Sequence, residues 1–351
     1  MSESRGTSNR SGRSEDGEWA MKITFQFLLV SALVVGALLG CGPGDGVTGD
    51  TPGTISRPAE EASSSTPQDV AEAAAAGIDE TSIRTHLARL TGASPAPLGG
   101  REVMISERGS ESGRRAAAEY MKSSFEEIGI PARILQFSSG GLRGFNVEAT
   151  LWGTEGGRHL WVTAHLDSVH NAGANDDASG LTSILLTAKA LKEIEPEHTV
   201  HFVAYDLEEV GLFGSTHYVG NTVKGVRERE GARAIIGNLQ SDMIAYEEDG
   251  FDAVLGTCGR AGYIDDALSQ AAEELDSPIE LREVCLGRSD HEPFWAAGYP
   301  AAVLTDGAIY DGYPCYHRPC DTVDKLNISY LRSMIELTAA ATALLADPQE
   351  D

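Results

Sequence analysis

Five short segments of the sequence carry histidine and carboxylate side chains that could do chemistry together. They span residues 163–167, 173–180, 205–211, 240–243 and 313–322. Taken singly, each has an ordinary explanation: Asp176 and Asp177 could cap a helix, and Glu208 and Glu209 could lie in a solvated loop. Their joint occurrence, each at or near the end of a predicted strand, needs a further explanation.

Together these segments supply two histidines and three or four carboxylates. Carboxylates that gather in one place repel one another and lose water, and a multivalent cation removes that cost. Imidazole and carboxylate ligands without thiolates are typical of a catalytic zinc site that keeps an open coordination position. The residue types therefore indicate a hydrolytic metal centre.

The elements around these segments predict how they meet. Apolar periodicity indicates helices over residues 82–90, 113–128, 178–194, 263–275, 291–297 and 328–345. Short apolar runs indicate strands over residues 133–137, 146–152, 159–164, 199–205, 234–239, 251–255, 279–284 and 300–304. This alternation predicts an α/β fold with a mostly parallel sheet covered on both faces. Sites in such folds lie beyond the carboxyl ends of the strands, where the acidic and histidine residues occur.

Composition limits the classes of partner. Among 351 residues, 53 are acidic and 27 are basic, giving a formal net charge of −26. Such a charge argues against binding of nucleic acid and against docking on anionic lipid through a basic patch. Five cysteines are too few for a disulfide scaffold of this length, but they suffice for one or two local bridges.

The N-terminal part has the pattern of an export signal. Met21 and Lys22 precede an apolar stretch at 25–39, which ends in Leu-Leu-Gly-Cys41 and resembles the lipobox of bacterial lipoproteins. We expect a signal region over 1–40, whose true start could be Met21, with lipidation at Cys41; an ordinary signal peptide or a buried helix is the alternative. Residues 41–77 then read as an acidic flexible tether and residues 78–351 as one domain. The protein would be exported and held at a membrane only by its lipid.

Six motifs carry a resemblance to a known family: HLDS, GANDDASG, EEVGLFGS, QSDM, GRSDH and YHRPCDT, which begin at residues 165, 173, 208, 240, 287 and 316. In this ordered set the chain resembles the secreted di-zinc aminopeptidases of the bacterial leucyl aminopeptidase and aminopeptidase Y group, and most of all the compact Streptomyces type. The resemblance implies a three-layer zinc-exopeptidase fold, with a mostly parallel mixed sheet between helices.

The resemblance also implies a ligand set of five residues and two zinc ions per chain. His165 and Asp242 would bind one ion, Glu209 and His317 would bind the other, and Asp176 would bridge both. Two further residues would support these ligands. Asp167 would orient the imidazole of His165, and Asp177 would follow Asp176 through a peptide bond that is often cis in this family.

Three more residues would serve the reaction. Glu208 would be the general base, although the sequence alone does not separate its role from that of Glu209. Tyr316 would support the oxyanion, and Arg288 would line the substrate site. The implied reaction removes the N-terminal residue from peptides with a free N-terminus. A glutaminyl cyclase-like enzyme with one zinc ion, or a non-catalytic binding relative, is the alternative.

Four cysteines remain after Cys41, and they allow three pairings. The resemblance pairs Cys315 with Cys320, which leaves Cys258 and Cys285 as a second pair. The sequence leaves open whether calcium also binds on the acidic surface. Among the other histidines, His170 could compete as a ligand and His291 could support the site from behind. The remainder are expected on the surface of strands or helices, namely His86, His159, His198, His201 and His217.

Overall fold

A computed structural model describes residues 65–154, 157–247 and 250–346. The chain divides into a unit over residues 1–60 and a unit over Glu61–Asp351, and every described residue belongs to the second. The predicted signal region 1–40, the proposed lipidation site Cys41 and most of the predicted tether lie outside the described residues. Within the described part of the chain, no helix combines the length and apolarity needed to cross a membrane.

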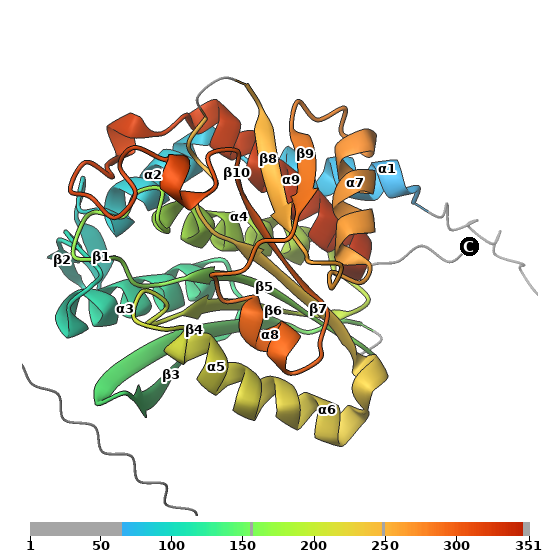
Figure 1. The fold of residues 1–351 in the computed structure, drawn as a ribbon, viewed down its shortest axis with the longest axis horizontal. Helices are drawn as coiled ribbons and strands as arrows, with labels where there is room; N and C mark the ends of the chain where they lie inside the picture. The colour runs from blue at the N-terminus through green and yellow to red at the C-terminus, as the bar shows by residue number, and fades with distance from the viewer. Residues whose placement is uncertain (1–64, 155–156, 248–249, 347–351) are drawn as a thin grey trace, which may run out of the picture. The chain divides into compact units, whose positions relative to one another are not determined.

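A mixed sheet forms the middle of the domain (Figure 1). Its eight strands run in the order β3-β4-β6-β5-β7-β10-β8-β9. The pairs β5–β6, β5–β7, β7–β10 and β8–β9 are parallel, and the pairs β3–β4, β4–β6 and β8–β10 are antiparallel. The strand bounds are Ala132–Ser139 for β3, Leu142–Leu151 for β4, His159–His165 for β5, Thr199–Tyr205 for β6, Ile235–Ser241 for β7, Asp252–Gly256 for β8, Glu280–Val284 for β9 and Ala301–Asp306 for β10. A separate hairpin pairs β1 (Ala96–Leu98) with β2 (Arg101–Val103).

Helices cover both faces of this sheet, which confirms the predicted three-layer α/β architecture (Figure 1). One face carries α1 (Pro67–Ala76), α2 (Glu80–Leu90), α3 (Glu111–Glu127), α4 (Ala178–Ile194), α7 (Ile264–Glu274) and α9 (Ile328–Ala346). The other carries α5 (Phe213–Tyr218), a π-helix (Val219–Val223), α6 (Lys224–Glu230) and α8 (Glu292–Ala296). Short 3₁₀ turns occur at Ala232–Ala234, Tyr310–Gly312 and Val323–Lys325.

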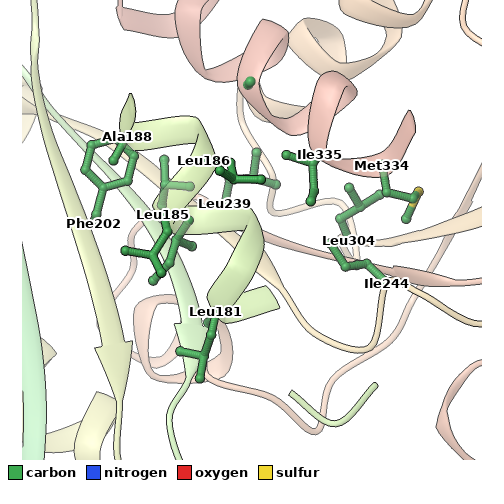
Figure 2. Close-up of a cluster of buried hydrophobic side chains, with 14 of the residues drawn as sticks. Leu181, Leu185, Leu186, Ala188, Phe202, Leu239, Ile244, Leu304, Met334 and Ile335 are labelled. Carbon is green, nitrogen blue, oxygen red and sulfur yellow. The ribbon is translucent and has the colours of Figure 1, made fainter. Parts of the chain in front are cut away.

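Helix α4 lies across the centre of the sheet and begins where the prediction placed it. The Asp177 carboxylate caps it by accepting from the Gly180 N–H at 2.8 Å. Apolar residues at helical spacing, Leu181 and Leu185 among them, belong to the same hydrophobic core as Phe202 of β6 (Figure 2). This packing fixes the N-terminus of α4 relative to the strand ends.

The tether prediction is wrong for its last part, because Pro67–Ala76 forms α1. Thr66 and Asp69 make a capping box at its start. Val70, Ala71 and Ala74 are buried on the side that packs against α9. These small residues follow a segment rich in Gly, Pro and Ser, so the sequence signal for a docked helix is weak.

The prediction of surface histidines is also wrong for three residues, because His159, His198 and His201 are buried. His159 and His201 belong to the sheet, and His159 Nδ1 lies 2.9 Å from His201 Nε2. The other ring nitrogen of each histidine faces a carboxylate. His159 Nε2 lies 2.8 Å from Glu230 Oε2, and His201 Nδ1 lies 3.2 Å from Glu148 Oε1. A buried imidazole is tolerated when its nitrogens have hydrogen-bond partners. The residue type alone does not show whether a histidine has such partners.

Candidate metal centre

Three neighbouring parallel strands deliver the first candidate ligands to one edge of the sheet. His165 is the last residue of β5, Asp242 directly follows β7, and Glu209 lies in the turn after β6. Since these strands are adjacent in the order β6-β5-β7, their carboxyl ends meet. Asp176 joins them from the loop before α4, and His317 joins them from the loop after β10.

The five predicted ligands come together at this edge. His165 Nε2 lies 2.9 Å from Asp176 Oδ1 and 3.6 Å from Asp242 Oδ1. His317 Nε2 lies 3.0 Å from Glu209 Oε2 and 3.3 Å from Asp176 Oδ2. The two oxygens of Asp176 therefore face different histidines, an arrangement that suits a carboxylate shared between two ions.

The pKa values of His165, His317 and Glu209 depart strongly from their usual values. Burial alone would lower the pKa of His165, but the carboxylates facing it raise that pKa well above its usual value. Hydrogen bonds to Asp176 and Glu209 raise the pKa of His317 to about 10. Burial raises the pKa of Glu209 to about 7, and the neighbouring Asp176 adds to that rise. The carboxylates around both imidazoles therefore favour positive charge at this edge of the sheet.

The donor set fits divalent metal ions. Glu209 Oε1 is buried and has no hydrogen-bond partner. Buried polar atoms normally have partners, so this oxygen indicates a group that belongs beside it. Two imidazoles with carboxylates and without thiolate are a ligand set that zinc accepts. Within the described part of the chain, His165, Asp176 and Glu209 each offer a ligand atom, and these three atoms lie within 4.8 Å of one another.

The two predicted supporting carboxylates hold the backbone of the centre. Asp177, joined to Asp176 by a cis peptide bond, accepts from the backbone N–H groups of His165 at 3.2 Å, Gly180 at 2.8 Å and Met243 at 3.3 Å. One of its oxygens also lies within 4.8 Å of ligand atoms of His165 and Asp242. Its hydrogen bonds tie the end of β5, the start of α4 and the segment after β7 together around the centre.

The hydrogen bonds of Asp167 differ from those predicted for it. Its Oδ1 lies 3.7 Å from His165 Nδ1, which is too long for a hydrogen bond. Its carboxylate instead accepts from the N–H groups of Glu208 and Glu209 at 3.0 and 3.2 Å. Asp167 thus fixes the turn that carries both glutamates.

Glu208 is half-buried beside the centre. Burial raises the pKa of its carboxyl well above the usual value; the charge of His165 opposes that rise, and the charges of Asp290, Asp242 and Glu209 add to it. A raised pKa brings a carboxyl closer to the range in which a general base works at neutral pH.

Tyr316 and Arg288 lie at the His317 side of the centre. The Tyr316 ring stacks on His317 with ring centroids 3.8 Å apart. Burial raises the pKa of the Tyr316 hydroxyl, so that hydroxyl stays protonated and can donate. The Arg288 guanidinium lies 5.5 Å from the centroid of the Tyr310 ring, and its charge partly offsets the rise at Tyr316.

Both expected disulfides are present. Cys315–Cys320 encloses the loop with His317, and Cys258–Cys285 joins the ends of β8 and β9. The sequence left the roles of His170 and His291 undecided. His170 is exposed and lies 3.4 Å from Glu107, which is not one of the five candidate ligands. His291 is buried and bonds the Leu286 carbonyl at 3.0 Å.

Two buried residues support the centre without having been assigned a role from sequence. Asp321 accepts from the N–H groups of Asn175 and Asp176 at 2.8 and 3.1 Å. Arg108 is fully buried and donates to carbonyls of the loop between His165 and Asp176. Asp321 belongs to the YHRPCDT motif, which could have indicated it; the partners of Arg108 are backbone atoms, which leave no sequence signal.

Comparison with known proteins identifies the family of the chain. The chain belongs to peptidase family M28, which it matches over residues 146–342. It is 29% identical over 300 residues to leupeptin-inactivating enzyme 1 of Streptomyces exfoliatus, covering 79% of this chain and 62% of that protein. It is 32% identical over 188 residues to aminopeptidase YwaD of Bacillus subtilis, covering 52% and 40%. The chain therefore spans less than two thirds of the length of these relatives.

Solved structures share the fold. An aminopeptidase from Aneurinibacillus sp. strain AM-1 superposes with a TM-score of 0.67 at 18% identity, covering 80% of this chain and 97% of that one. A glutaminyl cyclase from Fimbriiglobus ruber superposes with a TM-score of 0.61 at 20% identity, covering 76% and 95%. Because both kinds of enzyme share this architecture, the fold does not choose between their reactions.

Proposed function

We propose that this protein is a metal-dependent aminopeptidase that uses two zinc ions. The observation that carries the proposal is the position of Asp176, whose two oxygens face His165 and His317 respectively. His165 and Asp242 would hold one ion, and Glu209 and His317 would hold the other. When bound, the ions would supply Lewis-acid polarisation of the scissile carbonyl and of a water molecule.

The protein's own side chains account for proton transfer and orientation. Glu208 accepts a proton from the attacking water and delivers it to the leaving amine as the carbon–nitrogen bond breaks. The Tyr316 hydroxyl donates to the oxygen on which negative charge develops. The substrate's free ammonium group lies near the carboxylates of Glu208 and Asp242, which favours chain ends over internal peptide bonds.

Replacement of Glu208 tests this assignment. Glu208→Gln keeps the shape of the side chain but cannot take up the proton, so kcat on aminoacyl anilides should fall by about 10²–10⁴-fold. Zinc content, measured by mass spectrometry of the dialysed protein, should stay unchanged. Glu119→Gln, at an exposed glutamate paired with Arg115, is the control and should retain full activity. Full activity of Glu208→Gln would refute its role.

A glutaminyl cyclase-like activity is the second candidate, because glutaminyl cyclases are among the structures that share this fold. Assays on peptides that begin with glutamine separate the two. Cyclisation with release of ammonia, together with one zinc ion per chain, would favour the cyclase. Release of the first residue, together with two zinc ions, would favour the aminopeptidase. A chain that binds no zinc and transforms neither substrate would indicate a binding protein.

We also propose that the precursor is exported and lipidated at Cys41. The support is the sequence Leu-Leu-Gly-Cys41 after an apolar stretch, followed by acidic chain up to the folded domain. Fatty-acid labelling should mark the parent and not Cys41→Ser. Equal labelling of both proteins would refute the anchor.

A further inference from the structure

A groove of about 590 Å³ lies between α5 and α8. Figure 1 shows these two helices on the same face of the sheet. We call it the α5–α8 groove. Its volume is within the range of ligand sites in proteins. One wall comes from the start of α5 and the π-helix, the other from α8 and the turn after it. The lining residues are mostly apolar or small, with two charged residues among them: Leu212, Thr216, Val219, Gly220, Arg260, Glu292, Pro293, Trp295, Ala296 and Ala297.

The first wall begins at the turn that carries the proposed base. The Leu212 N–H donates to the Glu208 carbonyl at 3.0 Å, and the Gly211 N–H donates to the same carbonyl at 2.9 Å. Leu212 is therefore held directly to Glu208, and the same wall continues along Thr216 and Val219. A π-helix turn, such as the one that begins at Val219, is rare and often occurs at a functional site.

The second wall begins at the loop that carries Arg288. The Glu292 carboxylate lies against Gly287, so closely that a methyl group at Gly287 would collide with it. Glu292 also donates its N–H to the Ser289 carbonyl at 3.0 Å. Both walls thus start at loops that border the candidate metal centre.

The proposed reaction fixes which part of a peptide lies on this side. Glu208 delivers the proton to the leaving amine, so the residues that follow the scissile bond begin within reach of Glu208. Aromatic rings lie on the His317 side of the centre, where Tyr316 stacks on His317 and Tyr310 lies 6.2 Å from Tyr316 between ring centroids. A peptide chain that leaves the centre past Glu208 meets Leu212 and the groove.

The lining also defines the chemistry of the occupant. Apolar walls favour apolar side chains, and the exposed Arg260 guanidinium stands 5.6 Å from the centroid of the Trp295 ring. That fixed cation suits a carboxylate at the end of a short peptide. Resting on the proposed function, we infer that the α5–α8 groove binds the leaving part of the substrate and favours apolar residues followed by a C-terminal carboxylate.

Filling the groove at Gly220 tests the inference. A Cβ at Gly220 would meet no atom within 4 Å, so Gly220→Leu can fold with its side chain in the groove. Gly77, at the end of α1, also has open space, and Gly77→Leu is the matched control. Two substrates are compared: a leucine anilide, which has no residue beyond the scissile bond, and a leucyl pentapeptide with apolar residues at positions two to four.

We expect Gly220→Leu to lower kcat/KM for the pentapeptide by about tenfold, which corresponds to roughly 1.4 kcal/mol. The anilide should be unaffected, and Gly77→Leu should change neither substrate. Arg260→Gln should lower kcat/KM about fivefold for the pentapeptide with a free carboxylate, but not for its C-terminal amide. Unchanged pentapeptide cleavage in both variants would overturn the inference, as would equal losses on both substrates.

Failure of the proposed function gives a different result. If the zinc-loaded parent cleaves neither substrate, the aminopeptidase proposal fails. Binding of the intact pentapeptide, followed by calorimetry, then tests the groove on its own. Binding that Gly220→Leu weakens and Gly77→Leu leaves unchanged would support the groove, and absence of binding to the parent would refute it.

Discussion

Replacing Arg108 by methionine should destabilise the domain strongly, because this buried cation holds the loop beneath the candidate metal centre. Its guanidinium donates to the carbonyls of Leu166, Ala172, Gly173 and Leu90 at 2.9, 2.8, 2.9 and 3.0 Å. Each hydrogen bond to a charged group is worth about 1.5–3 kcal/mol, and removing one partner from a buried charge network costs about 3–5 kcal/mol.

The structure therefore leads us to expect a loss of about 4 kcal/mol in the free energy of unfolding for Arg108→Met. Arg108→Lys keeps the charge and some of the contacts, so about half of that loss is expected. Urea unfolding followed by circular dichroism measures both. Arg84→Met is the control, because Arg84 is exposed and its pair with Glu80 is worth at most about 0.5 kcal/mol.

The same variant should weaken metal binding. The loop that Arg108 holds carries Asp167 and Asp176, and partners that orient metal ligands typically contribute about 10–100-fold in affinity. Competition with a zinc-sensitive dye measures this affinity. The reasoning would be refuted if the free energy of unfolding of Arg108→Met lay within 1 kcal/mol of the parent's, or if its zinc affinity were unchanged. Either result would show that these hydrogen bonds contribute little.

Three other perturbations have defined outcomes. Asp321→Asn should lower zinc affinity more than overall stability, since its carboxylate holds the Asp176 N–H at 3.1 Å; an equal fall in both would contradict this. Leu185→Ala in the core of Figure 2 should cost about 2–5 kcal/mol in urea unfolding, and a cost under 1 kcal/mol would show that the site collapses without a cavity. Glu148 is buried, which alone would raise its pKa, but hydrogen bonds from His201, Tyr218 and Arg133 lower it from 4.5 to about 2. The ionised Glu148 carboxylate therefore contributes fully to the free energy of unfolding above pH 4.5. This contribution of roughly 3 kcal/mol is lost as the pH falls towards 2. Thermal melts of Glu148→Gln should therefore depend less on pH in that range than melts of the parent.

The five candidate ligands were predicted from the resemblance of six motifs to a known family, and local signals alone predicted only that some of them lie at strand ends. His165, Glu209 and Asp242 follow apolar strands, and parallel strands bring their carboxyl ends together. The start of α4 could be predicted for a similar reason, since a capping carboxylate at Asp177 precedes a clear helical period.

Other features depend on contacts that leave no local pattern. Residues 213–230 form helices that the apolar period does not reveal, because Gly214, Gly220 and Gly225 interrupt it and a π-turn shifts its phase. Helix α1 is stabilised by docking on α9, which is a tertiary effect. The α5–α8 groove arises between segments distant in sequence, so only the folded chain shows it.

Anomalous diffraction from zinc-soaked crystals, recorded on both sides of the zinc absorption edge, tests the central claim most directly. We predict two peaks per chain, one among His165, Asp176 and Asp242 and the other among Asp176, Glu209 and His317. A single peak, or zinc bound away from these side chains, would contradict the account of a two-ion centre shared through Asp176.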